Sequence, residues 1–107
     1  MSLDVCLERV QPTVVYSSNI THNLGDMAQA VGIYMCLWRP DEMGIGHASQ
    51  LIPLLQDGLQ KLKGDPEKYK KYNATNGWGV YEQFVLWVEE YLKACEDYPD
   101  AAVRVSR

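Results

Sequence analysis

The apolar residues of this chain repeat with the period of a strand near both ends and with the period of a helix in between. Residues 4–19 contain two strand patterns divided by Gln11-Pro12, and residues 101–107 contain a third. Because strand and helix patterns are segregated rather than alternating, they favour an α+β fold. We predict a small antiparallel sheet, formed by an N-terminal hairpin and a C-terminal strand, packed against three main helices.

The first two main helices are predicted from apolar stripes and from residues that start and stop helices. The first begins at Asn23, which we expect to be its N-cap, and ends before Pro40. The second begins near Ser49, again a predicted cap, and ends at Gly64. Residues 41–47 between them form a predicted loop.

The third main helix has the most regular apolar period of the chain, from Tyr81 to Cys95, and Pro99 stops it. A short helical turn is expected over residues 66–72. Gly58 lies inside the second helix, where it is expected to cost about 1 kcal/mol relative to alanine.

Length and charge exclude several classes of protein. With 107 residues and 12.2 kDa, residues 1–107 are predicted to form a single domain. The net charge of −4 disfavours binding to duplex nucleic acid. No apolar run approaches the roughly 20 residues that span a bilayer, and no secretory signal is recognised at the start, so we expect a cytoplasmic protein without membrane contact. Three widely spaced cysteines predict neither a disulfide framework nor a zinc site, and no cofactor or metal is expected.

Polar residues gather where the second strand pattern meets the first helix pattern. Asn19, Thr21, His22 and Asn23 follow one another there, and their amides and hydroxyl can read the polar edge of a ligand. An alternative interpretation is that these side chains only form turn hydrogen bonds and a helix cap.

A second candidate segment, Asn76-Gly77-Trp78-Gly79, precedes the third helix. An indole between two glycines can present its face to a planar ring, and Tyr81 follows closely. Asn76 adds a hydrogen-bonding amide. Alternatively, the segment is a helix-entry turn in which Trp78 is an apolar staple.

Three further residues are candidates for the same ligand. Trp38 can stack on a ring, and Arg39 and Arg104 can hold a phosphate. Alternatively, Trp38 ends an apolar stripe as a core residue, and Arg39 stacks on it or pairs with Asp41 or Glu42. Five lysines in residues 61–71 form a basic segment within an acidic protein, which favours either a solvated helix face or steering of an anionic partner. His22 and Asp26 are four residues apart and are the weakest candidates, as an acid/base pair.

Several of these segments together resemble a family of small uncharacterised proteins encoded by bacteriophages and prophages. The matching segments are Asn19-Ile20-Thr21-His22-Asn23-Leu24, Met27-Ala28, Gly32-Ile33-Tyr34, Leu37-Trp38-Arg39-Pro40, Asn76-Gly77-Trp78-Gly79 with Tyr81-Glu82, and Val105-Ser106-Arg107. The resemblance covers about residue 16 to the end. It implies a viral origin and action in the cytoplasm of a bacterial host, and it implies no catalytic residues.

We therefore expect a small ligand-binding protein that sequesters a nucleotide-derived signal of the host without turning it over. This expectation rests partly on analogy with phage proteins that withhold immune signals. A homo-oligomer would help so short a chain enclose a ligand. One alternative is an inhibitor or adaptor that binds a host protein, and another is a hydrolase of a nucleotide signal that uses His22. The ligand-binding hypothesis requires the two polar segments to line one cavity.

Overall fold

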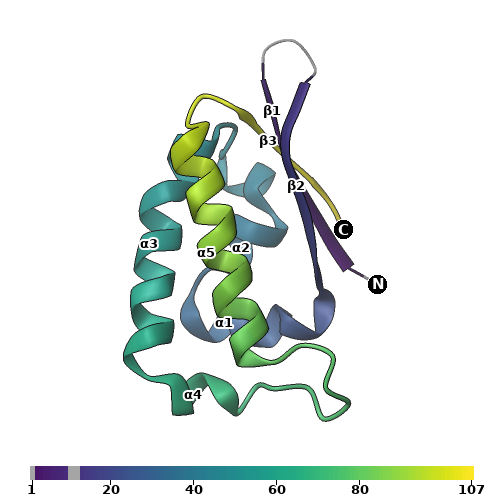
Figure 1. Cartoon of the computed structure of the whole chain (residues 1–107), viewed down its shortest axis with the longest axis vertical. Coiled ribbons are helices and arrows are strands. Elements are labelled where there is room, and N and C mark those ends of the chain that lie inside the picture. The colour runs from purple at the N-terminus through teal and green to yellow at the C-terminus, as the bar shows by residue number, and fades with distance from the viewer. Residues whose placement is uncertain (1, 10–12) are drawn as a thin grey trace.

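The three strands form one antiparallel sheet with the order β2-β1-β3. The computed structural model describes residues 2–9 and 13–107, so the predicted turn at Gln11-Pro12 lies outside the described residues. The strands are β1 (Ser2–Arg9), β2 (Thr13–Thr21) and β3 (Ala102–Ser106). β1 is central, because it pairs with β2 through Val5↔Ser18 and with β3 through Val5↔Val105. The predicted α+β fold is confirmed, with the sheet on one side of the helices (Figure 1).

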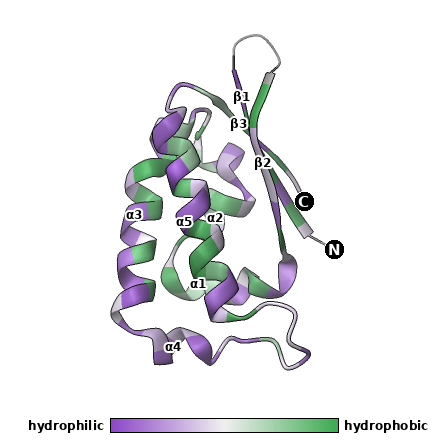
Figure 2. Cartoon of the chain, viewed as in Figure 1, coloured by the Kyte–Doolittle hydropathy of each residue, from purple (hydrophilic) through white to green (hydrophobic). Residues whose placement is uncertain are grey.

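The helices cover one face of this sheet. Along the chain they are η1 (His22–Leu24), α1 (Gly25–Val31), α2 (Tyr34–Trp38), η2 (Pro40–Met43), α3 (Ala48–Gly64), α4 (Pro66–Lys70) and α5 (Tyr81–Asp97). Leu3, Val5 and Leu7 of β1 are buried, whereas Asp4 between them is exposed, so alternate residues face the helices. Figure 2 shows the same division on α3 and α5, each of which has hydrophobic and hydrophilic residues on different sides.

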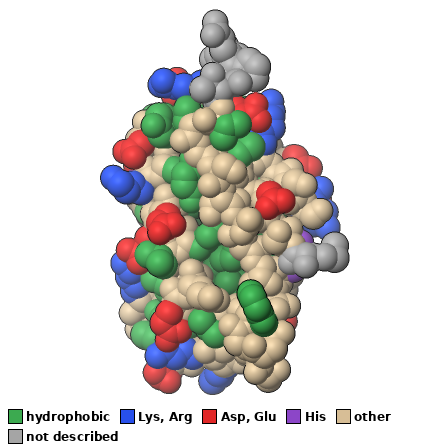
Figure 3. All heavy atoms as spheres, turned by 45° about the vertical axis from the view of Figure 1, so that its right-hand side comes forward, with side chains coloured by type: hydrophobic (Ala, Val, Ile, Leu, Met, Phe, Trp, Pro, Cys, Tyr) green, Lys and Arg blue, Asp and Glu red, His purple; other side chains and the backbone are tan. Residues whose placement is uncertain are grey.

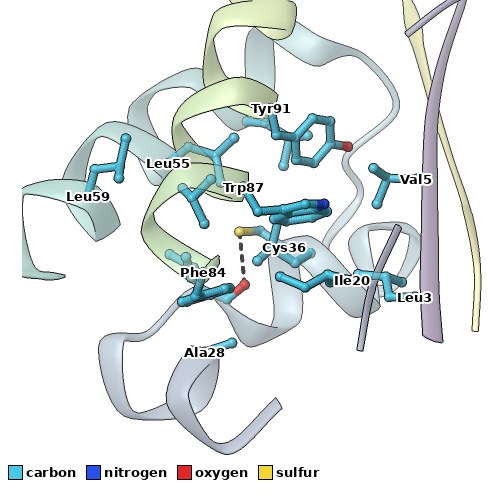
Figure 4. Close-up of a cluster of buried hydrophobic side chains, with 14 of the residues drawn as sticks. Leu3, Val5, Ile20, Ala28, Cys36, Leu55, Leu59, Phe84, Trp87 and Tyr91 are labelled. Carbon is cyan, nitrogen blue, oxygen red and sulfur yellow. Dashed lines mark hydrogen bonds between the residues drawn. The ribbon is translucent and has the colours of Figure 1, made fainter. Parts of the chain in front are cut away.

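Helix α5 lies between α3 and the sheet and contacts both. More of its surface is therefore buried than the apolar period of its sequence indicates. Phe84 and Val88 are buried as predicted, but Trp87 and Tyr91 are buried too. Figure 4 shows Trp87 and Tyr91 among the core side chains, on the side of α5 that approaches the sheet. The Trp87 indole donates a hydrogen bond to the Ser18 hydroxyl of β2 over 3.0 Å, which ties α5 to the sheet.

The first predicted helix is broken into shorter pieces. Gly32 adopts φ +90°, a left-handed conformation that ends α1, and α2 begins two residues later at Tyr34. The predicted caps are also wrong. The Thr21 hydroxyl, not Asn23, accepts the hydrogen bond from the first turn, and the Gln50 side chain accepts from the His47 backbone at the start of α3 in place of Ser49.

Gly58 is a packing requirement of α3 rather than only a weak helix former. A Cβ atom at this position would lie 2.7 Å from Cγ2 of Ile33, which is itself buried in the connection between α1 and α2. Ile33 is β-branched and has few alternative rotamers, so it cannot easily move away. Because Gly58 has no side chain, α3 packs closely against the connection between α1 and α2.

We expect Gly58→Ala to lower the free energy of unfolding, although alanine is the better helix former. The overlap with Ile33 should cost about 1–3 kcal/mol, more than the roughly 1 kcal/mol gained in helix propensity. Gly64→Ala is the matched control, because nothing lies within 4 Å of a Cβ there, and it should be neutral or slightly stabilising. Urea denaturation measures both, and a stabilised Gly58→Ala variant would contradict the packing argument. The double variant with Ile33→Ala should show favourable coupling between the two sites.

Candidate functional site

The two polar segments identified in the sequence line one cleft. Asn19, Thr21 and Asn23 at the end of β2 and in η1 lie across a cavity of about 610 Å³ from Asn76 and Trp78 of the loop before α5. This volume is within the usual range for small-molecule sites. The complete lining is Ser2, Asn19, Ile20, Thr21, Asn23, Leu24, Asn76, Trp78, Gly79, Gln83 and Trp87.

The described lining of the cleft is polar and contains no charged side chain. Six of its lining residues carry hydroxyl or amide side chains, and no acidic, basic or histidine side chain is among them. In Figure 3, the lower right part of the surface consists mainly of tan polar side chains and backbone around a few green hydrophobic groups. Such a lining recognises a ligand by hydrogen bonds and apolar contact rather than by ion pairing.

Trp78 is the largest exposed hydrophobic side chain of the described chain, with 71% of its surface accessible. It is therefore not the buried staple that the alternative interpretation predicted. Its backbone is nevertheless fixed, since the Trp78 amide donates to Asn76 Oδ1 over 3.0 Å and its carbonyl accepts from Asn23 Nδ2 over 2.9 Å. The loop thus holds an indole face in solvent at the edge of the cleft.

Gly79 is where the loop touches η1. Its φ is +110°, and a Cβ there would lie 3.1 Å from Asn23 Cβ and 3.2 Å from Thr21 Cγ2. Glycine satisfies both the left-handed conformation and the close approach. The second glycine of the predicted loop motif therefore brings the two halves of the cleft together.

The amides of the cleft are only partly used within the protein. The Asn23 side-chain amide donates one N–H to the Trp78 carbonyl, and the Asn76 side-chain oxygen accepts from the Trp78 backbone amide. The Asn23 side-chain oxygen and the Asn76 side-chain N–H groups therefore remain for a ligand. Gln83 likewise accepts at its oxygen from the Val80 amide and keeps its N–H groups. The Asn19 side chain is exposed and makes no hydrogen bond to another described residue. Both donors and acceptors are therefore available in one place.

Two predicted stacking residues are not at the cleft. Trp38 is only 2% exposed, and its indole N–H donates to His22 Nδ1 over 2.8 Å beneath η1. Tyr81 is buried, and its hydroxyl donates to the Leu62 carbonyl over 2.7 Å, which links α5 to α3. Neither ring presents a face to a ligand, so the stacking role predicted for them is corrected to a role in the core.

The predicted phosphate-binding arginines lie elsewhere too. Arg39 forms an ion pair with Glu42 over 2.9 Å at the end of α2. Arg104 lies on β3, opposite Cys6 of β1, with that central strand between it and β2. Neither residue lines the cleft.

His22 faces a neighbouring cavity rather than the cleft. Sequence reasoning also missed Ser2, Gln83 and Trp87, which line the cleft from β1 and α5. Gln83 and Trp87 are four residues apart, about one helical turn, and this spacing gives no sign of the role, because the role depends on how α5 lies against β2.

The predicted basic segment is largely neutralised. Lys61, Lys63 and Lys70 each lie within 4 Å of a carboxylate, from Asp57, Glu89 and both Glu67 and Glu82 respectively. Exposed pairs of this kind contribute little to stability, but they remove free positive charge from the surface. Lys68 and Lys71 form no such pair with the described part of the chain.

Comparison with protein-family models, curated proteins and solved structures finds no match for this chain. No helix among residues 2–9 and 13–107 is long and apolar enough to cross a membrane. Within the same ranges there is no cluster of three or more histidine, cysteine, aspartate or glutamate residues that suits a metal ion.

Proposed function

We propose that the protein binds a small planar ligand of the nucleobase type in the cleft between η1 and the Trp78 loop. The observation that carries this proposal is the convergence of an exposed indole and unused amide groups on one uncharged cavity. A nucleobase has a flat face for the indole and an edge with both donors and acceptors for the amides. A nucleoside, a nucleotide or a nucleotide-derived signal therefore suits the site.

Binding without turnover is the form of this function that the cleft supports best. General acid/base catalysis needs a titratable side chain within reach of the reacting atoms, and the described residues that line the cleft include none, because His22 and Asp26 line only the neighbouring cavity. The phage resemblance and analogy favour sequestration of a host signal. A protein partner on the lysine segment is less well supported, since three of its five lysines are already paired.

The test is a calorimetric titration of the protein with nucleosides, nucleotides, cyclic dinucleotides and ADP-ribose derivatives. Trp78→Ala should weaken binding of the best ligand by about 5- to 150-fold, the equivalent of the roughly 1–3 kcal/mol per base that stacking provides. Trp78→Phe should recover part of the affinity because it restores a ring. Chromatography after incubation should return the ligand unchanged.

Leu86→Ala is the matched control, because Leu86 is also an exposed apolar residue, 58% accessible, but lies outside the cleft lining. It should bind like the unmodified protein. No binding of any panel member at millimolar concentration would refute the proposal, and so would an unchanged affinity in Trp78→Ala.

A further inference from the structure

A second cavity of about 560 Å³ adjoins the cleft. It is lined by loop residues 71–76 and by His22, Asn23 and Asp26. Asn23 and Asn76 line both cavities, so these two amides form the boundary between them. A ligand whose ring lies against Trp78 can extend past this boundary into the second cavity.

The second cavity differs from the cleft in its charge. Lys71, Asp26 and His22 line it, whereas the cleft has no ionisable side chain among the described residues of its lining. Lys71 has no carboxylate within 4 Å in the described ranges, unlike three of the four lysines that precede it in the basic segment. Its ammonium group is therefore available for an external anion.

His22 is held in one orientation at this cavity. Its Nδ1 accepts the indole N–H of buried Trp38 over 2.8 Å, so the hydrogen of the neutral ring is on Nε2. Asn73 uses its oxygen to accept from the Tyr81 amide over 2.7 Å, which leaves its N–H groups as donors. The Lys71 ammonium and two hydrogen-bond donor groups thus line the same small space, together with the Asp26 carboxylate.

We propose that this second cavity is a subsite for a phosphate group carried by the ligand whose ring stacks on Trp78. This inference rests on the proposed function and specifies its ligand class as a nucleotide rather than a free base. Lys71 supplies the charge, and His22 Nε2 and the Asn73 amide supply hydrogen bonds to phosphate oxygens. Asp26 is an acceptor only, so it suits the hydroxyl groups of a sugar between ring and phosphate.

The experiment compares each of four ribonucleosides with its 5′-monophosphate by calorimetry. For the base that the cleft prefers, the monophosphate should bind about tenfold more tightly than the nucleoside, the equivalent of about 1.4 kcal/mol. Lys71→Gln should reduce the affinity for the monophosphate to that for the nucleoside and leave nucleoside binding unchanged. Lys68→Gln is the matched control, because Lys68 belongs to the same basic segment and has no carboxylate within 4 Å among the described residues, but lies outside both linings.

The outcomes separate this inference from the proposed function. Equal affinities for nucleoside and monophosphate would overturn the phosphate subsite and leave the cleft as a nucleoside site. An equal loss in Lys68→Gln and Lys71→Gln would overturn it too, since general surface charge would then explain the effect. Binding of inorganic phosphate without any nucleoside or nucleotide binding would refute both proposals.

Discussion

Replacing Trp38 with alanine is expected to lower the free energy of unfolding by about 3–5 kcal/mol, the usual cost of removing a buried aromatic side chain. Trp38 is 2% exposed, stacks on Tyr34 with ring centroids 5.1 Å apart, and donates its indole N–H to His22. The substitution leaves a cavity and an unpartnered His22 nitrogen. Chemical denaturation followed by circular dichroism measures the loss.

Two other substitutions give this prediction its controls. Trp78→Ala removes the same side chain from an exposed position, so its effect on unfolding should stay within about 0.5 kcal/mol. Trp38→Phe keeps a ring in the core and loses the hydrogen bond to His22, so its cost should lie between the two. Similar effects of Trp38→Ala and Trp78→Ala would show that the assignment of one to the core and the other to the surface is wrong.

Alkaline pH is expected to destabilise the protein strongly through two buried thiols. Burial raises the pKa of Cys36 and of Cys95 from 9.0 to about 12. Between these values the unfolded chain releases thiol protons that the folded protein retains, so the folded state binds more protons and stability falls as pH rises. Each thiol contributes about 1.4 kcal/mol per pH unit, which amounts to roughly 5 kcal/mol by pH 11 for the pair.

Denaturation at pH 8, 9, 10 and 11 under reducing conditions tests this pH dependence. Cys36→Ala should remove about half of the contribution that the two buried thiols make to the slope, whereas Cys6→Ala should retain most of it because the Cys6 thiol lies at the partly exposed face of β1. Burial also raises the pKa of Tyr91 well above 10, which acts in the same direction. A free energy of unfolding that stays constant from pH 9 to 11 would contradict the prediction.

The strands and the two longest helices could be predicted because their apolar periods are local properties of the sequence. The break at Gly32 could not, since an apolar stripe continues through it from Val31 to Tyr34. Gly58 was interpreted as a weakness for a similar reason. The reason that glycine is needed at position 58 is its contact with Ile33, which lies 25 residues away in the sequence and is brought close only by the packing of α3.

The candidate site was predicted in its polar segments but not in its partners. Trp38 ends a predicted apolar stripe and Trp78 lies between two glycines, yet the sequence leaves a core role and a stacking role open for both, and only the fold shows that Trp38 is buried and Trp78 exposed. The sequence leaves open whether Arg39 holds a phosphate or pairs with Asp41 or Glu42, and only the fold shows that it pairs with Glu42. Whether an arginine meets a ligand or a neighbouring carboxylate depends on distances that a linear pattern does not contain.

The order of the strands has a consequence for how the chain is made. The central strand, β1, is synthesised well before one of its two partners, β3, which ends at Ser106. Until that residue has been synthesised, β1 has an unpaired edge, and such edges invite pairing with other chains. Nascent molecules of this protein therefore have an incomplete sheet from the synthesis of β1 until that of β3, and products that end before β3 should be bound by chaperones or aggregate.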